Sequence, residues 1–134
     1  MKYLLDTCVL SDFARGDSHT LAHVKTTSPA LIGVSSISLM EIEFGLALNP
    51  AKARKLASVM YALFQAAAIL PYGQEDARAT ATLRASLQKR GRPIGAYDAL
   101  IAGCALARGL VLVTSNEREF RRVSGLSVEN WRKR

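Results

Sequence analysis

Several features that whole classes of proteins require are missing from this 134-residue sequence. Its two cysteines, Cys8 and Cys104, supply neither a disulfide framework nor a Cys-x-x-Cys metal motif. No apolar run approaches the roughly 18 residues that a transmembrane helix needs. Asp6 interrupts the N-terminal apolar stretch where a signal peptide would continue, so we expect no secretion signal. The expectation is a cytoplasmic protein without a membrane span.

Low-complexity segments, internal repeats and linkers are also absent from the sequence. Hydrophobic residues make up 49% of the chain and charged residues 22%, a balance typical of a globular rather than a disordered protein. The length suits one hydrophobic core. We therefore expect residues 1–134 to form a single domain.

Acidic residues are scarce in the second half of the chain. Residues 69–134 contain 12 Lys and Arg against 6 Asp and Glu, whereas residues 1–68 contain 6 against 5. Residues 77–92 contain five basic residues and no acid, and the chain ends on Arg132, Lys133 and Arg134. A one-sided basic surface is typical of proteins that bind polyanions such as nucleic acid. A charged face that only aids solubility has the same composition, so the charge leaves both interpretations open.

Short apolar runs alternate with segments of helical periodicity along the chain. Strands are predicted over residues 2–5, 31–35, 68–71, 110–114 and 126–129. Helices are predicted over residues 7–13, 19–27, 38–48, 51–67, 74–89, 97–108 and 116–122. The run from Leu110 to Thr114 has no polar alternation, which suits a strand buried on both faces of a parallel sheet. The whole pattern predicts α/β architecture with a central, mostly parallel sheet.

Four acidic residues stand just after a predicted strand or in the first turn of a predicted helix: Asp6, Glu41, Asp98 and Glu119. In an open α/β sheet, the carboxyl ends of the strands and the helix starts beside them share one edge, where ligands bind. Carboxylates gathered there would repel by roughly 4 kcal/mol per close pair at an effective dielectric constant of 20, a cost that a divalent cation removes. Mg²⁺ suits such a site because it prefers a few carboxylates together with waters and phosphate oxygens.

The same acids also have a purely structural explanation as helix caps. Ser38 and Glu41 fit the S-x-x-E capping box, and Asn116 and Glu119 have the same spacing. The other two acids would be favoured at a helix N-terminus as a cap or by the helix dipole. Caps do not require the acids to converge, whereas a metal site does.

Four stretches of the sequence carry a family resemblance: Tyr3–Thr7, Ser35–Gly45, Gly91–Ala102 and Leu112–Phe120. With the ending Gly125–Trp131, they resemble the PIN-domain family, and within it the VapC-like toxins of bacterial toxin–antitoxin pairs, in the right order along the chain. The resemblance implies a three-layer α/β/α fold and a Mg²⁺-dependent endoribonuclease, with Mn²⁺ able to substitute. It also implies an RNA substrate, such as tRNA or another structured RNA, and a cognate antitoxin that covers the active site.

The resemblance also assigns roles to the four acids. Asp6 and Asp98 would be the principal metal ligands, and Glu41 a third catalytic acid. Glu119 is taken as the fourth catalytic residue, although Asn116 could stand at that position and the sequence does not decide between them. The number of metal ions is equally open.

Position 8 departs from the family pattern, in which Asn follows the Asp-Thr pair. Cys8 replaces an amide that could hydrogen-bond the site by a small apolar thiol, while Thr7 would still support the site through its hydroxyl. We expect retained activity, and the alternative is a catalytically weak PIN-like RNA-binding or regulatory module. A cysteine phosphatase is disfavoured because Arg15 follows Cys8 after six residues rather than a five-residue anion loop.

Two further patterns concern partners and metals. The predicted helix over residues 51–67 carries more apolar residues than one core-facing stripe needs: Leu56, Val59, Met60, Leu63 and Phe64. Such a surface suits an antitoxin or the second copy of an expected homodimer, although a deeply buried helix would explain it too. His19 and His23 have i, i+4 spacing without an H-E-x-x-H motif, so surface positions are expected.

Overall fold

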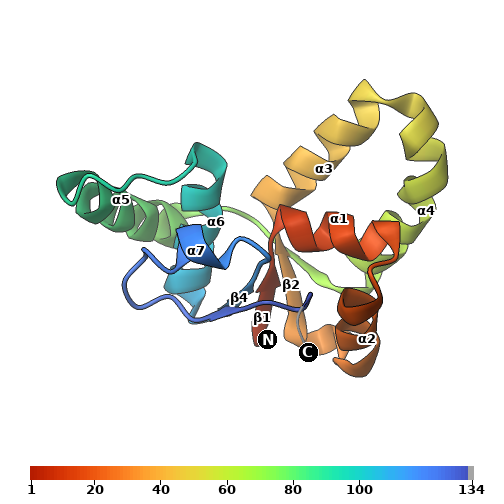
Figure 1. Cartoon of the computed structure of the whole chain (residues 1–134), viewed down its shortest axis with the longest axis horizontal. Helices are drawn as coiled ribbons and strands as arrows, with labels where there is room; N and C mark the ends of the chain where they lie inside the picture. The colour runs from red at the N-terminus through yellow and green to blue at the C-terminus, as the bar shows by residue number, and fades with distance from the viewer. Residues whose placement is uncertain (133–134) are drawn as a thin grey trace.

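A five-stranded sheet forms the centre of the molecule in the computed structural model, which describes residues 1–132 (Figure 1). The strands are β1 (Tyr3–Leu5), β2 (Ile32–Ser35), β3 (Ala68–Leu70), β4 (Val111–Val113) and β5 (Val128–Glu129). They lie in the order β3-β2-β1-β4-β5, and the pairings within the described part of the chain are all parallel. This confirms the predicted mostly parallel sheet. Lys133 and Arg134, part of the basic C-terminal run, lie outside the described residues.

Helices cover both faces of the sheet. They are α1 (Thr7–Arg15), α2 (Ser18–Thr26), α3 (Ser36–Leu48), α4 (Pro50–Ala66), α5 (Gln74–Lys89), α6 (Ala96–Arg108) and α7 (Glu117–Phe120), and a 3₁₀ turn at Pro29–Leu31 precedes β2. Figure 1 shows α5, α6 and α7 on one side of the sheet and α1 to α4 on the other. The predicted three-layer α/β/α fold is therefore confirmed.

Alternation of side chains along each strand fills two cores. Leu4 and Leu112 pack into the cluster formed with α5 and α6, whereas Leu5 and Val113 pack into the cluster formed with α1, α3 and α4. Successive strand residues point to opposite faces, and both faces are covered by helices. Burial on both faces explains why the residues of β4 form an unbroken apolar run.

Helix α3 begins two residues earlier than the sequence pattern indicates. The hydroxyl of Ser35 accepts a hydrogen bond from the N–H of Ile37 at 3.1 Å, so Ser35 is the N-cap. Ser38 therefore lies inside the helix, and Glu41 lies in its second turn rather than its first. The capping-box interpretation of Ser38 and Glu41 is wrong for this reason.

The C-terminal segment is fastened to α1 and α2. The Trp131 ring is 2% exposed and lies 5.2 Å from the Tyr3 ring and 5.1 Å from the imidazole of His23. Arg132 donates to both carboxylate oxygens of buried Asp12, at 2.7 and 2.6 Å. His23 is thus a packing residue, while His19 is exposed as expected.

Apolar side chains remain exposed on the α3–α4 hairpin. On α4, Met60 and Leu63 are buried but Val59 is 40% exposed, and on α3, Phe44 and Leu48 are 61% and 69% exposed. The apolar surplus of α4 is thus only partly explained by burial. Within residues 1–132, no helix combines the length and apolarity that crossing a membrane would need.

Candidate active site

Asp6 lies at the carboxyl end of β1, the central strand, where the chain turns into α1. Its Oδ1 accepts a hydrogen bond from the N–H of Val9 at 2.9 Å, so Asp6 is the N-cap of α1. The residue is only 2% exposed. Burial raises the pKa of this carboxyl to about 6, assisted by the charges of Asp98 and Asp12 and opposed by hydrogen bonds from Thr114 and Val9. A capping role therefore does not account for the whole environment of Asp6.

Asp98 is the third residue of α6, three positions after its N-cap, Gly95. Burial raises its pKa to about 6, with further contributions from the charges of Glu119 and Glu41. The charge of Asp98 in turn contributes to the raised pKa of Asp6. The four predicted acids therefore share one electrostatic environment at the carboxyl edge of the sheet.

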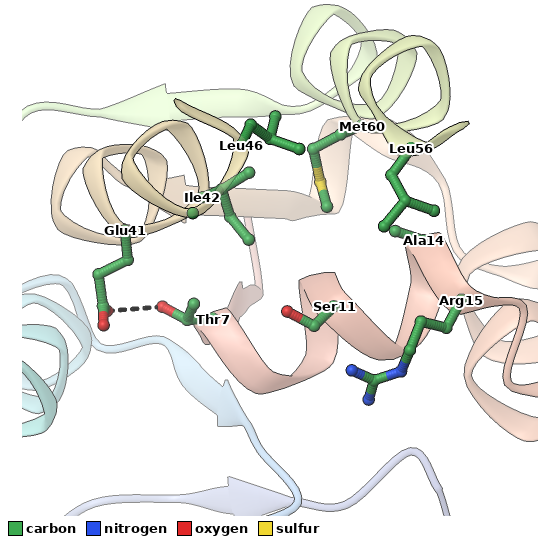
Figure 2. Close-up of a pocket in the computed structure, with 10 residues that line it drawn as sticks. Thr7, Ser11, Ala14, Arg15, Glu41, Ile42, Leu46, Leu56 and Met60 are labelled. Atoms are coloured by element: carbon green, nitrogen blue, oxygen red, sulfur yellow. Dashed lines mark hydrogen bonds between the residues drawn. The ribbon is translucent and has the colours of Figure 1, made fainter. Parts of the chain in front are cut away.

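Glu41 projects from α3 towards the start of α1. Its Oε1 accepts a hydrogen bond from the Thr7 hydroxyl at 2.7 Å (Figure 2). The Thr7 oxygen also lies 3.2 Å from the hydroxyl of Ser38. The carboxylate is therefore oriented by a residue that follows Asp6 directly. Thr7, whose hydroxyl the resemblance implied would support the site, thus bonds to Glu41.

Glu119 bridges α7 and the start of α6. Its Oε1 accepts a hydrogen bond from the N–H of Gly95 at 2.9 Å, and its Oε2 accepts one from the side-chain amide of Asn116 at 2.7 Å. These two bonds, Asn116 first and Gly95 second, lower the pKa of Glu119. The backbone N–H of Asn116 donates to Thr114 instead of Glu119, so the second capping-box interpretation is also wrong.

The donor chemistry of the site fits a hard divalent cation. Asp6 and Asp98 supply carboxylate oxygens whose pKa values are raised by burial and by the charges of neighbouring acids, a repulsion that a cation would relieve. Within the described part of the chain, no three His, Cys, Asp or Glu side chains are grouped closely enough to enclose an ion. An ion held by Asp6 and Asp98 would therefore have to complete its coordination with waters or other oxygen atoms.

Cys8 shows no sign of a nucleophilic role. Partial burial, and next the charges of Asp6 and Asp98, raise the pKa of its thiol to about 11. A thiol with a raised pKa stays protonated, whereas a reactive cysteine needs a lowered one. Arg15, the candidate anion-binding residue, pairs with Asp12 at 2.7 Å. The contacts leave no basis for a cysteine phosphatase.

A pocket of about 120 Å³ opens beside Glu41, between α1, α3 and α4 (Figure 2). Its polar end holds the Glu41–Thr7 hydrogen bond, and Arg15 lies at the opposite end. The wall between them is apolar and is formed by Ile42, Leu46, Leu56 and Met60. The sequence indicated the apolar face of α4 but not this pocket, because its enclosure depends on how the three helices pack.

The fold and the site together define a class: a three-layer α/β protein with an acidic, cation-suited site at the carboxyl edge of a parallel sheet. The PIN domain profile matches residues 3–126 of the chain. A Shigella flexneri protein named tRNA(fMet)-specific endonuclease VapC is 34% identical over 131 residues, which are 98% of each chain. A Salmonella typhimurium protein of the same name is 35% identical over 131 residues, again 98% of each chain.

Solved structures agree with the sequence comparison. The crystal structure of DNA-bound VapBC from Salmonella typhimurium contains a chain that superposes with a TM-score of 0.90 at 36% identity, covering 98% of both chains. FitAcB from Neisseria gonorrhoeae gives a TM-score of 0.82 at 27% identity, covering 96% of this chain and 97% of the other. The chain therefore belongs to the PIN-domain family and, within it, to the VapC group.

Proposed function

We propose that the chain is a Mg²⁺-dependent endoribonuclease, the toxin of a toxin–antitoxin pair, which cleaves structured RNA such as tRNA. The observation that carries the proposal is the pair of Asp6 and Asp98, two carboxyls with pKa values raised to about 6 at one edge of a parallel sheet. The named activity of the relatives from Shigella flexneri and Salmonella typhimurium, tRNA(fMet)-specific endonuclease, supports the RNA substrate.

Asp6 and Asp98 would hold the Mg²⁺ ion, and Mn²⁺ has the ligand preferences to replace it. When bound, the ion would polarise a non-bridging phosphate oxygen and lower the pKa of water. Asp6 is fixed for this purpose by its bond from Val9. Glu41 is oriented by Thr7, and it would accept a hydrogen bond from the attacking water and so align it with the phosphate.

The basic side chains between positions 77 and 92 would bind the RNA backbone. Arg78, Arg84, Lys89 and Arg90 are exposed along α5 and just after it, and Arg92 is exposed in the following loop. Contacts from Arg and Lys to phosphates fix the register of a nucleic acid without reading its sequence. We therefore assign them to affinity rather than to the choice of cleavage site.

The pocket beside Glu41 is the proposed contact site of the antitoxin. A bound segment would need apolar groups for the wall formed by α3 and α4, a cationic group for Glu41 and an anionic or polar group for Arg15. Occupation of this pocket would block Glu41, which would explain inhibition. The exposed Phe44 and Leu48 on α3 are assigned to the expected homodimer.

The test is RNA cleavage by the purified chain with Mg²⁺, with Mn²⁺ and in EDTA. Cleavage should require a divalent ion and be lost in the Asp6→Asn variant, because Asn is as good an N-cap as Asp but removes the charge. Asp17→Asn is the matched control, since Asp17 caps α2 through Thr20 in the same way, away from the acidic edge. Undiminished cleavage in chelator, or by Asp6→Asn, would refute the metal mechanism. A wild-type chain that binds RNA without cleaving it would favour the regulatory alternative.

A further inference from the structure

Both carboxylate oxygens of Glu119 are used inside the protein. Oε2 receives the Asn116 side-chain amide at 2.7 Å and Oε1 receives the Gly95 N–H at 2.9 Å. Two donors from different segments thus compensate the negative charge of this half-buried side chain. Each oxygen of Glu119 thus already makes a hydrogen bond within the protein, and the two bonds together fix the orientation of the carboxylate.

The residue that Glu119 holds is the N-cap of the helix that carries Asp98. Gly95 has no side chain with which to cap α6, but its C=O accepts the N–H of Ala99 at 2.9 Å. The two polar groups of Gly95 are therefore bonded in different directions, one to α7 and one to α6. A methyl group on Gly95 would lie 3.2 Å from Asp98 Oδ2 and 4.0 Å from Glu119 Oε1, so both carboxylates crowd the same glycine.

Two further hydrogen bonds join the loop before α6 to the α7 region. Arg90 donates to the C=O of Arg122 at 2.8 Å, and Arg122 donates to the C=O of Pro93 at 3.2 Å. With the Glu119–Gly95 bond, these contacts attach the loop between α5 and α6 at three points. Loops held at one point move more freely than loops held at several, so the α7 region fixes where α6 begins.

We propose that Glu119, oriented by Asn116, is a positioning residue that fixes the start of α6 and thereby the carboxylate of Asp98, and that it is not itself a metal ligand. The inference rests on the proposed function only in that Asp98 is taken as the ligand to be placed. It also gives each candidate for the fourth position a role. Asn116 orients Glu119, and Glu119 in turn holds Gly95, so the two residues act as one unit.

Two substitutions of Glu119 separate positioning from ligation. Glu119→Gln removes the charge but keeps a carbonyl acceptor for the Gly95 N–H, and a rotation of the Asn116 side chain presents its oxygen to the new amide. Glu119→Ala removes both hydrogen bonds. If Glu119 positions Asp98, the Gln variant should cleave RNA within about threefold of wild type. The Ala variant should be slower by about 100-fold, since small misplacements near reacting groups have effects of this size.

Two readouts are independent of RNA cleavage. Amide hydrogen exchange at Gly95 should be slow in wild type and in Glu119→Gln, and fast in Glu119→Ala. The affinity for Mn²⁺ alone, measured by titration calorimetry, should fall by about 10- to 100-fold in the Ala variant, as for other residues that orient metal ligands. In the Gln variant it should stay near wild type. If the wild-type chain cleaves no RNA, the proposed function fails while these two measurements still test the positioning role.

An acid outside the site provides the control for the Glu119 substitutions. Glu75→Gln makes the same chemical change at an exposed acid of α5 that pairs with Arg78, and it should alter neither Gly95 exchange nor Mn²⁺ affinity. Equal loss of Mn²⁺ affinity in Glu119→Gln and Glu119→Ala, with Gly95 still protected in the Gln variant, would make Glu119 a ligand and overturn the proposal. Fast Gly95 exchange in Glu119→Ala together with wild-type Mn²⁺ affinity would also overturn the proposal.

A second variant covers the case in which Glu119→Ala does not fold. Asn116→Ala leaves the Glu119–Gly95 bond possible but frees Oε2, so the carboxylate is no longer held from both sides. Exchange at Gly95 should rise and Mn²⁺ affinity should fall, both by less than in Glu119→Ala. Wild-type values for both in a folded Asn116→Ala protein would contradict the proposed action of the two residues as one unit.

Discussion

Asp98 has two opposing effects at the residue scale, because it stands in the first turn of α6 and among other acids. Interaction with the helix dipole would make Asp98→Asn less stable by about 0.3–1 kcal/mol. Its pKa, raised to about 6, instead indicates that ionising this carboxyl costs more free energy in the folded chain than in the unfolded chain. We expect the metal-free Asp98→Asn protein to melt at the same temperature as wild type or higher.

The same variant should lose the response to metal. RNA cleavage should fall by at least about 100-fold, or roughly 2.7 kcal/mol of transition-state stabilisation. The rise in melting temperature on adding Mg²⁺ should shrink because the folded state binds the ion less tightly. Thermal melts with and without Mg²⁺ and one cleavage assay measure all three effects. A variant that melts lower without metal and still cleaves RNA would show Asp98 to be a cap only.

Cys8 allows a second residue-scale prediction. Its side chain is exposed beside Asp6, and its thiol stays protonated at neutral pH. Cys8→Asn restores the amide of the family pattern, and we expect an unchanged fold and a change in cleavage rate of no more than about tenfold, or 1.4 kcal/mol. Circular dichroism and the cleavage assay check this. Complete loss of cleavage would point to a chemical role for the thiol.

The candidate site residues could be proposed from the sequence, but their contacts could not. Asp6 and Asp98 could be chosen from their places after a strand and at a helix start, together with the family resemblance. The partner of Glu41 is Thr7, 34 positions away, and that of Glu119 is Gly95, 24 positions away. Capping boxes are local patterns and were assigned in their place, because such long-range hydrogen bonds leave no mark in sequence spacing.

At the scale of elements, α5 and α6 pack closely against each other. Gly103 of α6 faces Thr80 of α5, and a Cβ at Gly103 would overlap the Thr80 side chain and approach the C=O of Asp76 at 3.0 Å. Thr80 cannot move away easily because its hydroxyl is hydrogen-bonded to Asp76 and to Tyr72. Gly103→Ala should therefore lower the free energy of unfolding by about 1–3 kcal/mol through overpacking.

Gly45 of α3 is the matched control for this prediction, since nothing lies within 4 Å of a Cβ placed there. Gly45→Ala should leave the free energy of unfolding unchanged or raise it by about 0.5–1 kcal/mol, because alanine is the better helix residue. Urea unfolding of both variants measures the difference. Equal effects of the two substitutions would show that the α5–α6 contact is looser than the distances indicate.

Helix boundaries could be predicted where a single local residue caps the helix, and less well where several residues could serve as the cap. Helix α5 runs from Gln74 to Lys89 as predicted, because Asp76 caps its start through the Gly73 N–H and Gly91 follows its end. Helix α3 has three serines near its start, and the sequence pattern favoured Ser38 over Ser35. The choice between them is made by the end of β2, a tertiary constraint.

For the whole molecule, the fold class was predictable but the order of strands was not. Periodicity identifies buried strands and crossover helices, yet many strand orders satisfy the same pattern. The order β3-β2-β1-β4-β5 places β1 in the middle, which sets Asp6 between the neighbouring strand ends. The central position of Asp6, and with it the burial that raises its pKa, follows from this topology.

The acidic edge should make global stability depend on pH and metal together. The folded pKa of Asp6 is about 6 and its unfolded value is 3.8, so the folded chain binds more protons between these pH values. Stability contributed by this group is therefore lost as pH rises from about 4 to about 6, and the loss is on the order of 3 kcal/mol. Asp98 acts in the same direction, with a smaller effect because solvent screens its less buried carboxyl.

Urea unfolding in EDTA at pH 4.5 and 7.5 tests this dependence, with Asp6→Asn as the reference that cancels the titrating groups not coupled to Asp6. Asp17 and Glu119, whose pKa values are lowered, lose their contributions as pH falls in both proteins alike. The stability of Asp6→Asn relative to wild type should therefore rise between pH 4.5 and pH 7.5. Saturating Mg²⁺ should stabilise wild type strongly at pH 7.5 and weakly at pH 4.5, because the ion binds ionised carboxylates. A difference between the two proteins that stays constant with pH, together with equal Mg²⁺ stabilisation at both values, would show that Asp6 is neither crowded nor a ligand.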